Sequence, residues 1–296
     1  MISHPRLGDY LSLLFLGVVW GGNFLLIKIG VETVPPATLA VARLVIAAAV
    51  TGVLAWRARE SFRFPRETWG AILLASVTGN ALPFILIGWG QTRIDAGLAA
   101  ICMAVMPLAT IVLAHLFTQD ERLTWRKGLG VVFGFIGLIV LIGPDRLSGF
   151  GKGALGELAV CAGAFCYGIN ALVTKHLRGQ PLIALASVTL GISALMDLPV
   201  ALAFEAPWAL APSWRSLIAI AVLAALPTGL GTLQMFGLIK KLGVSFFSQI
   251  NFIVPVAGVF WGALVFSERL PASAMVALGL ILIGIAVTRE RRGPVT

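Results

Sequence analysis

The chain has 296 residues, of which 58% are apolar and only 12% are charged, and its formal net charge is +9. Soluble domains carry about 25% charged residues, so this chain has too few charges to cover a water-exposed surface. Its Lys and Arg residues lie in short stretches between apolar runs instead of gathering on one soluble face, which argues against nucleic-acid binding.

Apolar runs long enough to cross a bilayer recur along the whole chain. About 20 apolar residues span the hydrocarbon core, and Gly, Pro and charged residues separate the runs. In chain order we expect ten membrane helices at 10–28, 36–56, 69–91, 96–117, 126–142, 153–175, 182–204, 215–239, 244–266 and 272–289. The sequence therefore predicts an all-α polytopic membrane protein with ten transmembrane helices and no separate soluble domain.

The basic residues predict how these helices are oriented. The connections on the amino-terminal side carry 15 Lys and Arg, and those on the opposite side carry 6. Cytoplasmic loops hold the excess of positive charge, so both termini are expected in the cytoplasm. An even number of helices agrees with this orientation, and a bacterial-type inner (plasma) membrane is the expected location.

An internal repeat divides the chain into two halves. Several residues recur after an offset of 147 residues: Trp20, Asn23 and Lys28 match Tyr167, Asn170 and Lys175, and Glu121-Arg122-Leu123 matches Glu268-Arg269-Leu270. We therefore expect two five-helix repeats, 1–147 and 148–296, within one membrane domain. Because five is odd, the second repeat enters the membrane in the opposite orientation. Inverted repeats are typical of transporters, whose substrate site lies near the midplane where the halves meet.

Short motifs in both halves carry a family resemblance. They are Trp20-Gly21-Gly22-Asn23-Phe24, Ala40-Val41-Ala42-Arg43-Leu44, Ala96-Gly97 to Pro107, Glu121-Arg122-Leu123-Thr124, Gly130 to Gly137, Val244-Ser245 to Pro255, Glu268-Arg269-Leu270, and Gly279 to Gly284. In order and spacing they resemble the EamA family of the drug/metabolite transporter superfamily over nearly the whole chain. The resemblance implies a ten-helix exporter of small metabolites, often amino acids. Leu190 stands where the second half would repeat Arg43, which makes equal roles of the two positions unexpected.

Four prolines mark the expected substrate cavity. Pro83, Pro107, Pro227 and Pro255 interrupt the third, fourth, eighth and ninth predicted helices, which are partners in the repeat. Each proline frees a carbonyl that needs another partner, and paired interruptions are the best sequence marker of a transporter site. A simple kink is the alternative at each position. We expect these four helices to line a central cavity.

Amide and apolar side chains near the prolines complete this cavity. Asn80, Gln234 and Asn251 can hydrogen-bond between helices or bind a zwitterionic solute. The expected apolar lining consists of Phe84, Met103 and Phe247. A mainly apolar cavity with a few neutral hydrogen-bonding groups suits amphipathic solutes such as hydrophobic or aromatic amino acids.

Arg43 and Asp197 are two charges deep within predicted helices, at similar depth. An ionised side chain at a helix centre costs about 2.5–3.5 kcal/mol, so each requires a reason. They can bind a substrate carboxylate or a coupling ion, or form an internal ion pair, or Arg43 can satisfy helix-end carbonyls. Glu157, near the start of its helix, is expected at the membrane interface.

The catalytic motifs of enzymes are absent from the sequence. It contains no HExxH, no GxSxG and no cluster of nucleophile, base and acid, and no phosphate-binding GxxxxGK[ST] of an ATP-driven motor. We expect no enzyme activity, no cofactor or metal, and no ATPase subunit. The predicted partners are a small-molecule solute and the lipid bilayer. The predicted function is secondary transport by alternating access; a small-solute channel or an uncoupled facilitator is the alternative.

Overall fold

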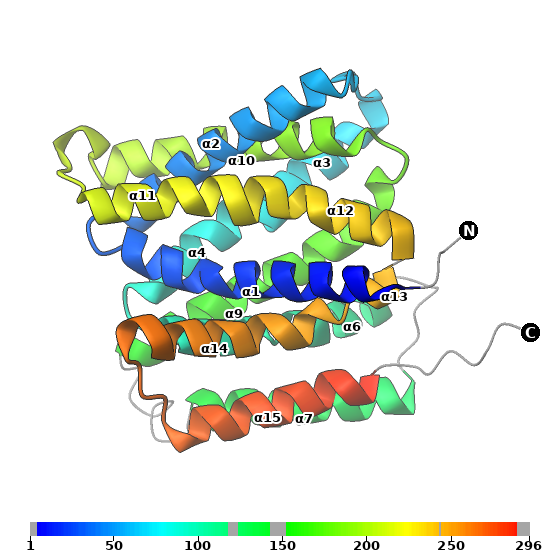
Figure 1. Ribbon diagram of the computed structural model, residues 1–296, viewed down its shortest axis with the longest axis vertical. Helices are drawn as coiled ribbons and strands as arrows, with labels where there is room; N and C mark the ends of the chain where they lie inside the picture. Colours follow the sequence, from blue (N-terminus) through cyan, green and yellow to red (C-terminus); the bar gives the residue numbers. More distant parts are fainter. Residues whose placement is uncertain (1–4, 118–123, 143–151, 243, 289–296) are drawn as a thin grey trace, which may run out of the picture.

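The computed structural model describes residues 5–117, 124–142, 152–242 and 244–288 (Figure 1). Within these ranges every regular element is helical, and no β-strand occurs. A bilayer favours this outcome, because a helix satisfies its backbone hydrogen bonds internally. The predicted all-α class is confirmed for the described part of the chain.

The described part of the first half contains five helical stretches, one of which is broken by a π-helical segment and another by a short gap. The elements in chain order are α1 (Leu7–Gly30), α2 (Pro36–Arg57), η1 (Arg66–Thr68), α3 (Trp69–Ser76), the π-helical η2 (Val77–Ala81), α4 (Leu82–Gln91), α5 (Ala96–Met103), α6 (Met106–Phe117) and α7 (Trp125–Ile142).

The second half repeats this order. Its elements are α9 (Lys152–Val173), η3 (Thr174–Leu177), α10 (Leu182–Phe204), η4 (Pro207–Ala209), α11 (Trp214–Leu223), the π-helical η5 (Ala224–Leu230), α12 (Gly231–Leu242), α13 (Val244–Phe247), α14 (Ile250–Phe266) and α15 (Ala272–Thr288).

Seven helical stretches in the described residues are long and apolar enough to cross a membrane: Leu7–Gly30, Pro36–Arg57, Arg66–Gln91, Ala96–Phe117, Gly153–Leu177, Leu182–Phe204 and Trp214–Ile239. Helices α14 and α15 are apolar too, with 17 residues each. The chain is therefore a multi-pass membrane protein, whereas the count of ten crossings stays a prediction. The repeat motif Glu121-Arg122-Leu123 lies outside the described residues.

Two closely packed helix pairs form the ends of the bundle. Helices α2 and α10 pack together at one end and α7 and α15 at the other, with α1, α9 and α14 among the helices between them (Figure 1). Small residues allow these close approaches. A Cβ atom at Gly21 of α1, for example, would lie only 2.8 Å from the backbone nitrogen of Gly258 in α14. Glycine is therefore required at the α1–α14 crossing.

Carboxylates just past the end of one helix hold the first turn of another. Glu205, directly after α10, accepts hydrogen bonds from the backbone N–H groups of Ala37 (2.9 Å) and Thr38 (2.6 Å) at the start of α2. Glu268, after α14, holds the start of α5 in the same way. The first N–H groups of a helix lack partners within it and attract negative charge, so these contacts stabilise the helix starts.

The opposite end of the α2–α10 pair has a matching contact. Glu60, which follows α2, accepts hydrogen bonds from the backbone N–H groups of Ile183 (2.9 Å) and Ala184 (2.8 Å) at the start of α10. Each helix thus ends where the other begins, and at both ends a glutamate hydrogen-bonds one helix to the other. These contacts fix α2 and α10 as an antiparallel unit.

Candidate functional site

Two π-helical breaks lie at equivalent positions of the two halves. η2 begins at Val77 and η5 begins at Ala224, 147 residues later. Both breaks contain backbone hydrogen bonds in which an N–H donates to the carbonyl five residues earlier. One of them runs from the Leu82 N–H to the Val77 carbonyl. η2 packs against α9 and α10, and η5 packs against α1 and α2, which hold the corresponding places in the other half. Such π segments are frequent at functional sites.

Side chains from two helices satisfy the backbone around Pro227 in η5. Proline has no N–H, so the Leu223 carbonyl loses its usual partner four residues later. The Thr228 hydroxyl donates to this carbonyl at 2.8 Å. The indole N–H of Trp20, in α1, donates to the Pro227 carbonyl at 3.1 Å. The predicted interruption at Pro227 is therefore a real break, and Trp20 and Thr228 hold its shape.

Arg43 of α2 reaches the same break. Its Nε atom donates to the Thr228 hydroxyl at 2.9 Å, and its guanidinium carbon lies 3.9 Å from the ring centroid of Phe84 in α4. Tyr167 of α9 packs in the same cluster as Phe84. Only 7% of Arg43 is exposed. One cation in the interior thus connects α2, α4 and η5.

An ion pair between Arg43 and Asp197, one of the alternatives for these two charges, is not formed. Thr228 and Phe84 hold the guanidinium beside α4 and η5, and no contact joins it to Asp197. The Asp197 side chain is 3% exposed, and its buried Oδ2 atom has no hydrogen-bond partner. Arg43 reaches a freed carbonyl only through the Thr228 hydroxyl. Its charge is therefore not neutralised by the acid that lies at similar depth.

Glu157 is buried near the start of its helix. It is the sixth residue of α9 and is 0% exposed. Helix α9 packs against α4 and α5. The sequence did not predict this burial, and the expected place of Glu157 at the membrane interface stays a prediction.

The amides of the predicted cavity separate into two groups. The Gln234 side chain donates to the Ser12 carbonyl at 3.0 Å and so joins α12 to α1. Asn80 in η2 and Asn251 in α14 are half-buried, and their side chains form no hydrogen bond with any described residue. A buried amide without a partner is costly, so a cavity lined by Asn80 and Asn251 would let water or a solute satisfy them. Gln234 instead holds two helices together.

Four of the predicted apolar and proline positions lie in one central cluster. Phe84 lies under Arg43, Pro227 accepts from Trp20, and the ring of Phe247 meets the ring of Trp20 edge-on at 5.9 Å. Pro83, fully buried, lies next to Phe84 at the start of α4. The central cluster is therefore built from α1, α2, α4, α9, η5 and α13.

The remaining predicted positions lie along the fourth and ninth predicted helices. Met103 ends α5 and packs against the main core, and Pro107 is the second residue of α6, so this predicted helix breaks just before its proline. Pro255 is buried inside α14, and the gap between α13 and α14 falls at residues 248–249. The interruption near Pro255 is thus several residues earlier than the proline itself.

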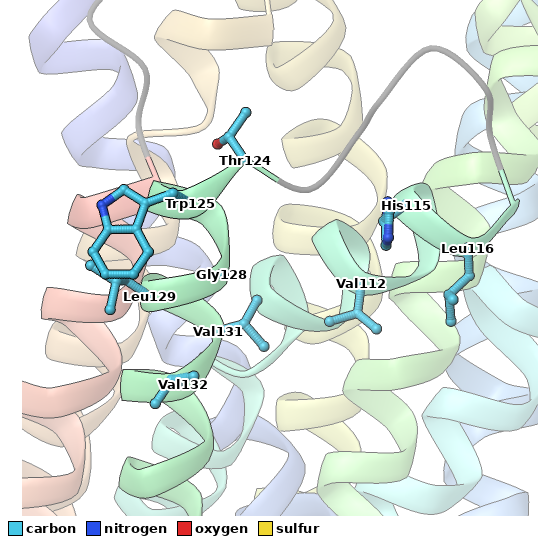
Figure 2. Close-up of a pocket in the computed structure, with 9 residues that line it drawn as sticks. All are labelled: Val112, His115, Leu116, Thr124, Trp125, Gly128, Leu129, Val131 and Val132. Atoms are coloured by element: carbon cyan, nitrogen blue, oxygen red, sulfur yellow. The ribbon is translucent and has the colours of Figure 1, made fainter.

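A surface pocket of about 470 Å³ lies away from this cluster, between α6 and α7 (Figure 2). Its lining is Val112, His115, Leu116, Thr124, Trp125, Gly128, Leu129, Val131 and Val132. The lining is almost entirely apolar, and Leu116 and Trp125 are 66% and 77% exposed. None of the predicted cavity residues lines it. An open apolar crevice between membrane helices suits the acyl chains of lipids better than an amphipathic solute. We therefore place the candidate solute site at the central cluster and not in this pocket.

Three residues of the central cluster were not predicted as site residues. Trp20 and Tyr167 are equivalent positions of the repeat, and both are aromatic side chains with a polar tip. Thr228 belongs to a Thr-Gly pair that occurs at both breaks, at 78–79 and 228–229. An aromatic pair related by the repeat, and a hydroxyl beside a proline break, are signals that could have identified them.

Comparison with known proteins shows relatives over nearly the full length. The chain is 23% identical to "Uncharacterized transporter YoaV" of Bacillus subtilis, covering 93% of this chain and 94% of the relative. It is 24% identical to the "S-adenosylmethionine/S-adenosylhomocysteine transporter" of Chlamydia trachomatis, with 92% and 86% covered. It is also 24% identical to the "Probable terminal-alkyne amino-acid exporter" of Streptantibioticus cattleyicolor, with 95% and 93% covered.

A solved structure supports the fold. A chain titled "Crystal structure of protein" aligns with a TM-score of 0.68 at 20% identity, covering 98% of this chain and 100% of that one. The EamA-like transporter family matches twice, at residues 8–143 and 154–289. These two matches include both π-helical breaks, and they establish that the chain belongs to the EamA-like transporter family.

Proposed function

We propose that the chain is a secondary transporter, not an enzyme, and that it exports small amphipathic metabolites by alternating access through a central cavity. The observation that carries this proposal is the pair of π-helical breaks, η2 and η5, at equivalent positions of the two halves. Broken helices at equivalent positions typically border a transporter's substrate site. They also supply places where backbone geometry can change without unravelling a whole helix. Export is the direction implied by the family resemblance.

The proposed architecture has ten membrane helices in two inverted repeats, 1–147 and 148–296. The two family matches support a division into two related halves. The reciprocal contacts of Glu60 and Glu205 support opposite directions for the equivalent helices α2 and α10. The start of α1 and the end of α15 lie at the same edge of the bundle (Figure 1). We place that edge at the cytoplasmic face of a bacterial-type inner membrane, following the bias of basic residues.

The proposed solutes are amino acids and related compounds, with hydrophobic or aromatic side chains favoured. The central cluster offers aromatic surfaces from Trp20, Phe84 and Phe247. Asn80 and Asn251 keep amide groups that no described residue satisfies. Two relatives whose names mention a solute are named for an amino acid and for S-adenosylmethionine. This combination suits a solute with an apolar side chain and polar backbone groups.

Counterflow in liposomes tests the proposal. Purified protein is reconstituted, loaded with an unlabelled amino acid, and diluted into a trace of the labelled compound. An alternating-access transporter produces a transient overshoot of label inside, whereas a channel allows only equilibration. We expect an overshoot with at least one aromatic or hydrophobic amino acid. Equilibration without overshoot would support a channel, and the same assay with a pH gradient distinguishes proton coupling from uncoupled facilitation.

A further inference from the structure

Arg43 holds a positive charge in the membrane interior, and no described residue is an acidic partner for it. It is 7% exposed, and its hydrogen-bond and ring contacts are with the neutral side chains of Thr228 and Phe84. Two ion pairs of the described residues, Arg215–Glu32 and Lys241–Asp9, lie at helix ends. Buried charges are normally paired, so this cation has room for a negatively charged group that no described residue supplies.

The guanidinium group is oriented so that its outer edge stays available. Its Nε atom is used by Thr228, and Phe84 covers one of its faces. Its two terminal amino groups donate to no described residue, and they are not among the fully buried polar atoms that lack a partner. Some of their surface is therefore accessible. A fork of two parallel N–H donors is the geometry with which arginine binds a carboxylate.

The second half of the chain has no arginine equivalent to Arg43. The equivalent residue in the second half is Leu190, which is buried in the apolar cluster with Phe84 and Ala194. The deep carboxylate Asp197 does not reach Arg43. The site therefore offers one cation to one anion, next to aromatic surface from Phe84 and Tyr167.

We propose that Arg43 binds the carboxylate of the transported solute, so that the substrates are amphipathic compounds with a free carboxylate. Thr228 is then a positioning residue, because it orients the guanidinium through Nε and ties it to the break at Pro227. This inference rests on the proposed transport function, and it narrows the substrate class: an amide or ester of the same compound lacks the negative charge and keeps only one neutral carbonyl acceptor for the fork.

Binding and counterflow with a matched pair of probes test this assignment. The probes are phenylalanine and phenylalaninamide, which differ in the carboxylate. Binding is followed by thermal melting of purified protein in a maltoside detergent, and transport by counterflow in liposomes. We expect wild-type protein to prefer the acid by about tenfold or more, as expected for the loss of charge-assisted hydrogen bonds. Arg43→Gln should lose this preference, and Arg43→Lys should retain only part of it.

Arg93→Gln is the matched control. Arg93 also stacks on an aromatic ring, 3.5 Å from the centroid of Trp89, but it is exposed at the end of its helix. This variant should keep the wild-type preference for the acid. Inorganic phosphate at equal ionic strength, and added phosphatidylglycerol, test whether a free anion or a lipid phosphate occupies the fork instead. If either one protects the protein against melting through Arg43 while phenylalanine does not, the solute assignment is wrong.

The outcomes separate this inference from the transport proposal. Equal binding of acid and amide by wild-type protein would overturn the role of Arg43, and so would a preference that survives in Arg43→Gln. Carboxylate-selective binding without counterflow would instead contradict transport and leave the binding site in place. If Arg43→Gln does not fold, the acid-over-amide preference of the wild-type protein and of Thr228→Val tests the role of Arg43. Thr228→Val keeps the charge of Arg43 but should weaken this preference, because the guanidinium loses the contact that orients it.

Discussion

The two π-helical breaks share a backbone form but differ in their polar contacts. At η5, side chains from α1 and α2 reach in, with Trp20 on the Pro227 carbonyl and Arg43 on Thr228. At η2, Thr78 bonds to a carbonyl of its own helix, and Ser193 of α10 donates to the Ser76 carbonyl at 2.9 Å. No charge approaches η2 among these contacts. The two breaks therefore share a backbone form, but among these contacts only η5 meets a charged side chain, Arg43.

The strongest test of the relation between the halves is their orientation. Ser61 and Trp208 lie at equivalent places in the connections after α2 and α10, and both are exposed. Each is replaced by cysteine in a chain whose three native cysteines are substituted. We expect a membrane-impermeant thiol reagent to label Ser61→Cys only from the cytoplasm and Trp208→Cys only from the opposite side. Labelling of both from one side would contradict inverted repeats.

A smaller effect should distinguish the two ends of the α2–α10 pair. Glu205 uses both carboxylate oxygens and also accepts from the Thr38 hydroxyl, whereas Glu60 uses one oxygen for two N–H groups. We expect Glu205→Ala to lower the free energy of unfolding by about 2 kcal/mol and Glu60→Ala by about 1 kcal/mol. Thermal melting in one detergent gives the order. A larger loss of unfolding free energy for Glu60→Ala would show that the number of hydrogen bonds does not decide how much each glutamate stabilises the helix pair.

The threonines beside the two breaks provide the finest comparison. Thr228→Val removes the donor to Leu223 and the acceptor for Arg43, so it should lower the free energy of unfolding by roughly 1.5 kcal/mol. Thr78→Val removes one bond within its own helix and should cost only about 0.5 kcal/mol. Thr232→Val is a control, because the Thr232 hydroxyl also bonds within its helix. Equal melting temperatures for all three variants would mean that Thr228 does not hold the break.

Much of the fold could be predicted because it depends on features that are local in sequence. Long apolar runs determine where helices form, and a constant offset reveals related halves without any knowledge of contacts. The proline at 227 also predicted a break correctly, because a missing N–H has the same consequence in any helix.

The contacts of the site could not be predicted from the same features. Arg43 was expected to bind a substrate carboxylate or a coupling ion, to pair with Asp197, or to satisfy a carbonyl. Its hydrogen-bond partner within the protein is the hydroxyl of Thr228, 185 residues away. Which side chain meets which depends on the rotation and depth of each packed helix, and apolar composition does not specify either. For the same reason the bond from Gln234 to Ser12, the burial of Glu157 and the glutamate ties of α2 and α10 were missed.

The central claim is that a solute passes between the two breaks, and cysteine protection tests it most directly. Asn80→Cys and Asn251→Cys, each in the cysteine-substituted chain, are treated with a small hydrophilic thiol reagent in liposomes. The reagent should modify both positions, and any amino acid that shows counterflow should slow the modification at both. If neither cysteine is modified, or if a transported solute protects neither, the cavity does not lie between η2 and η5.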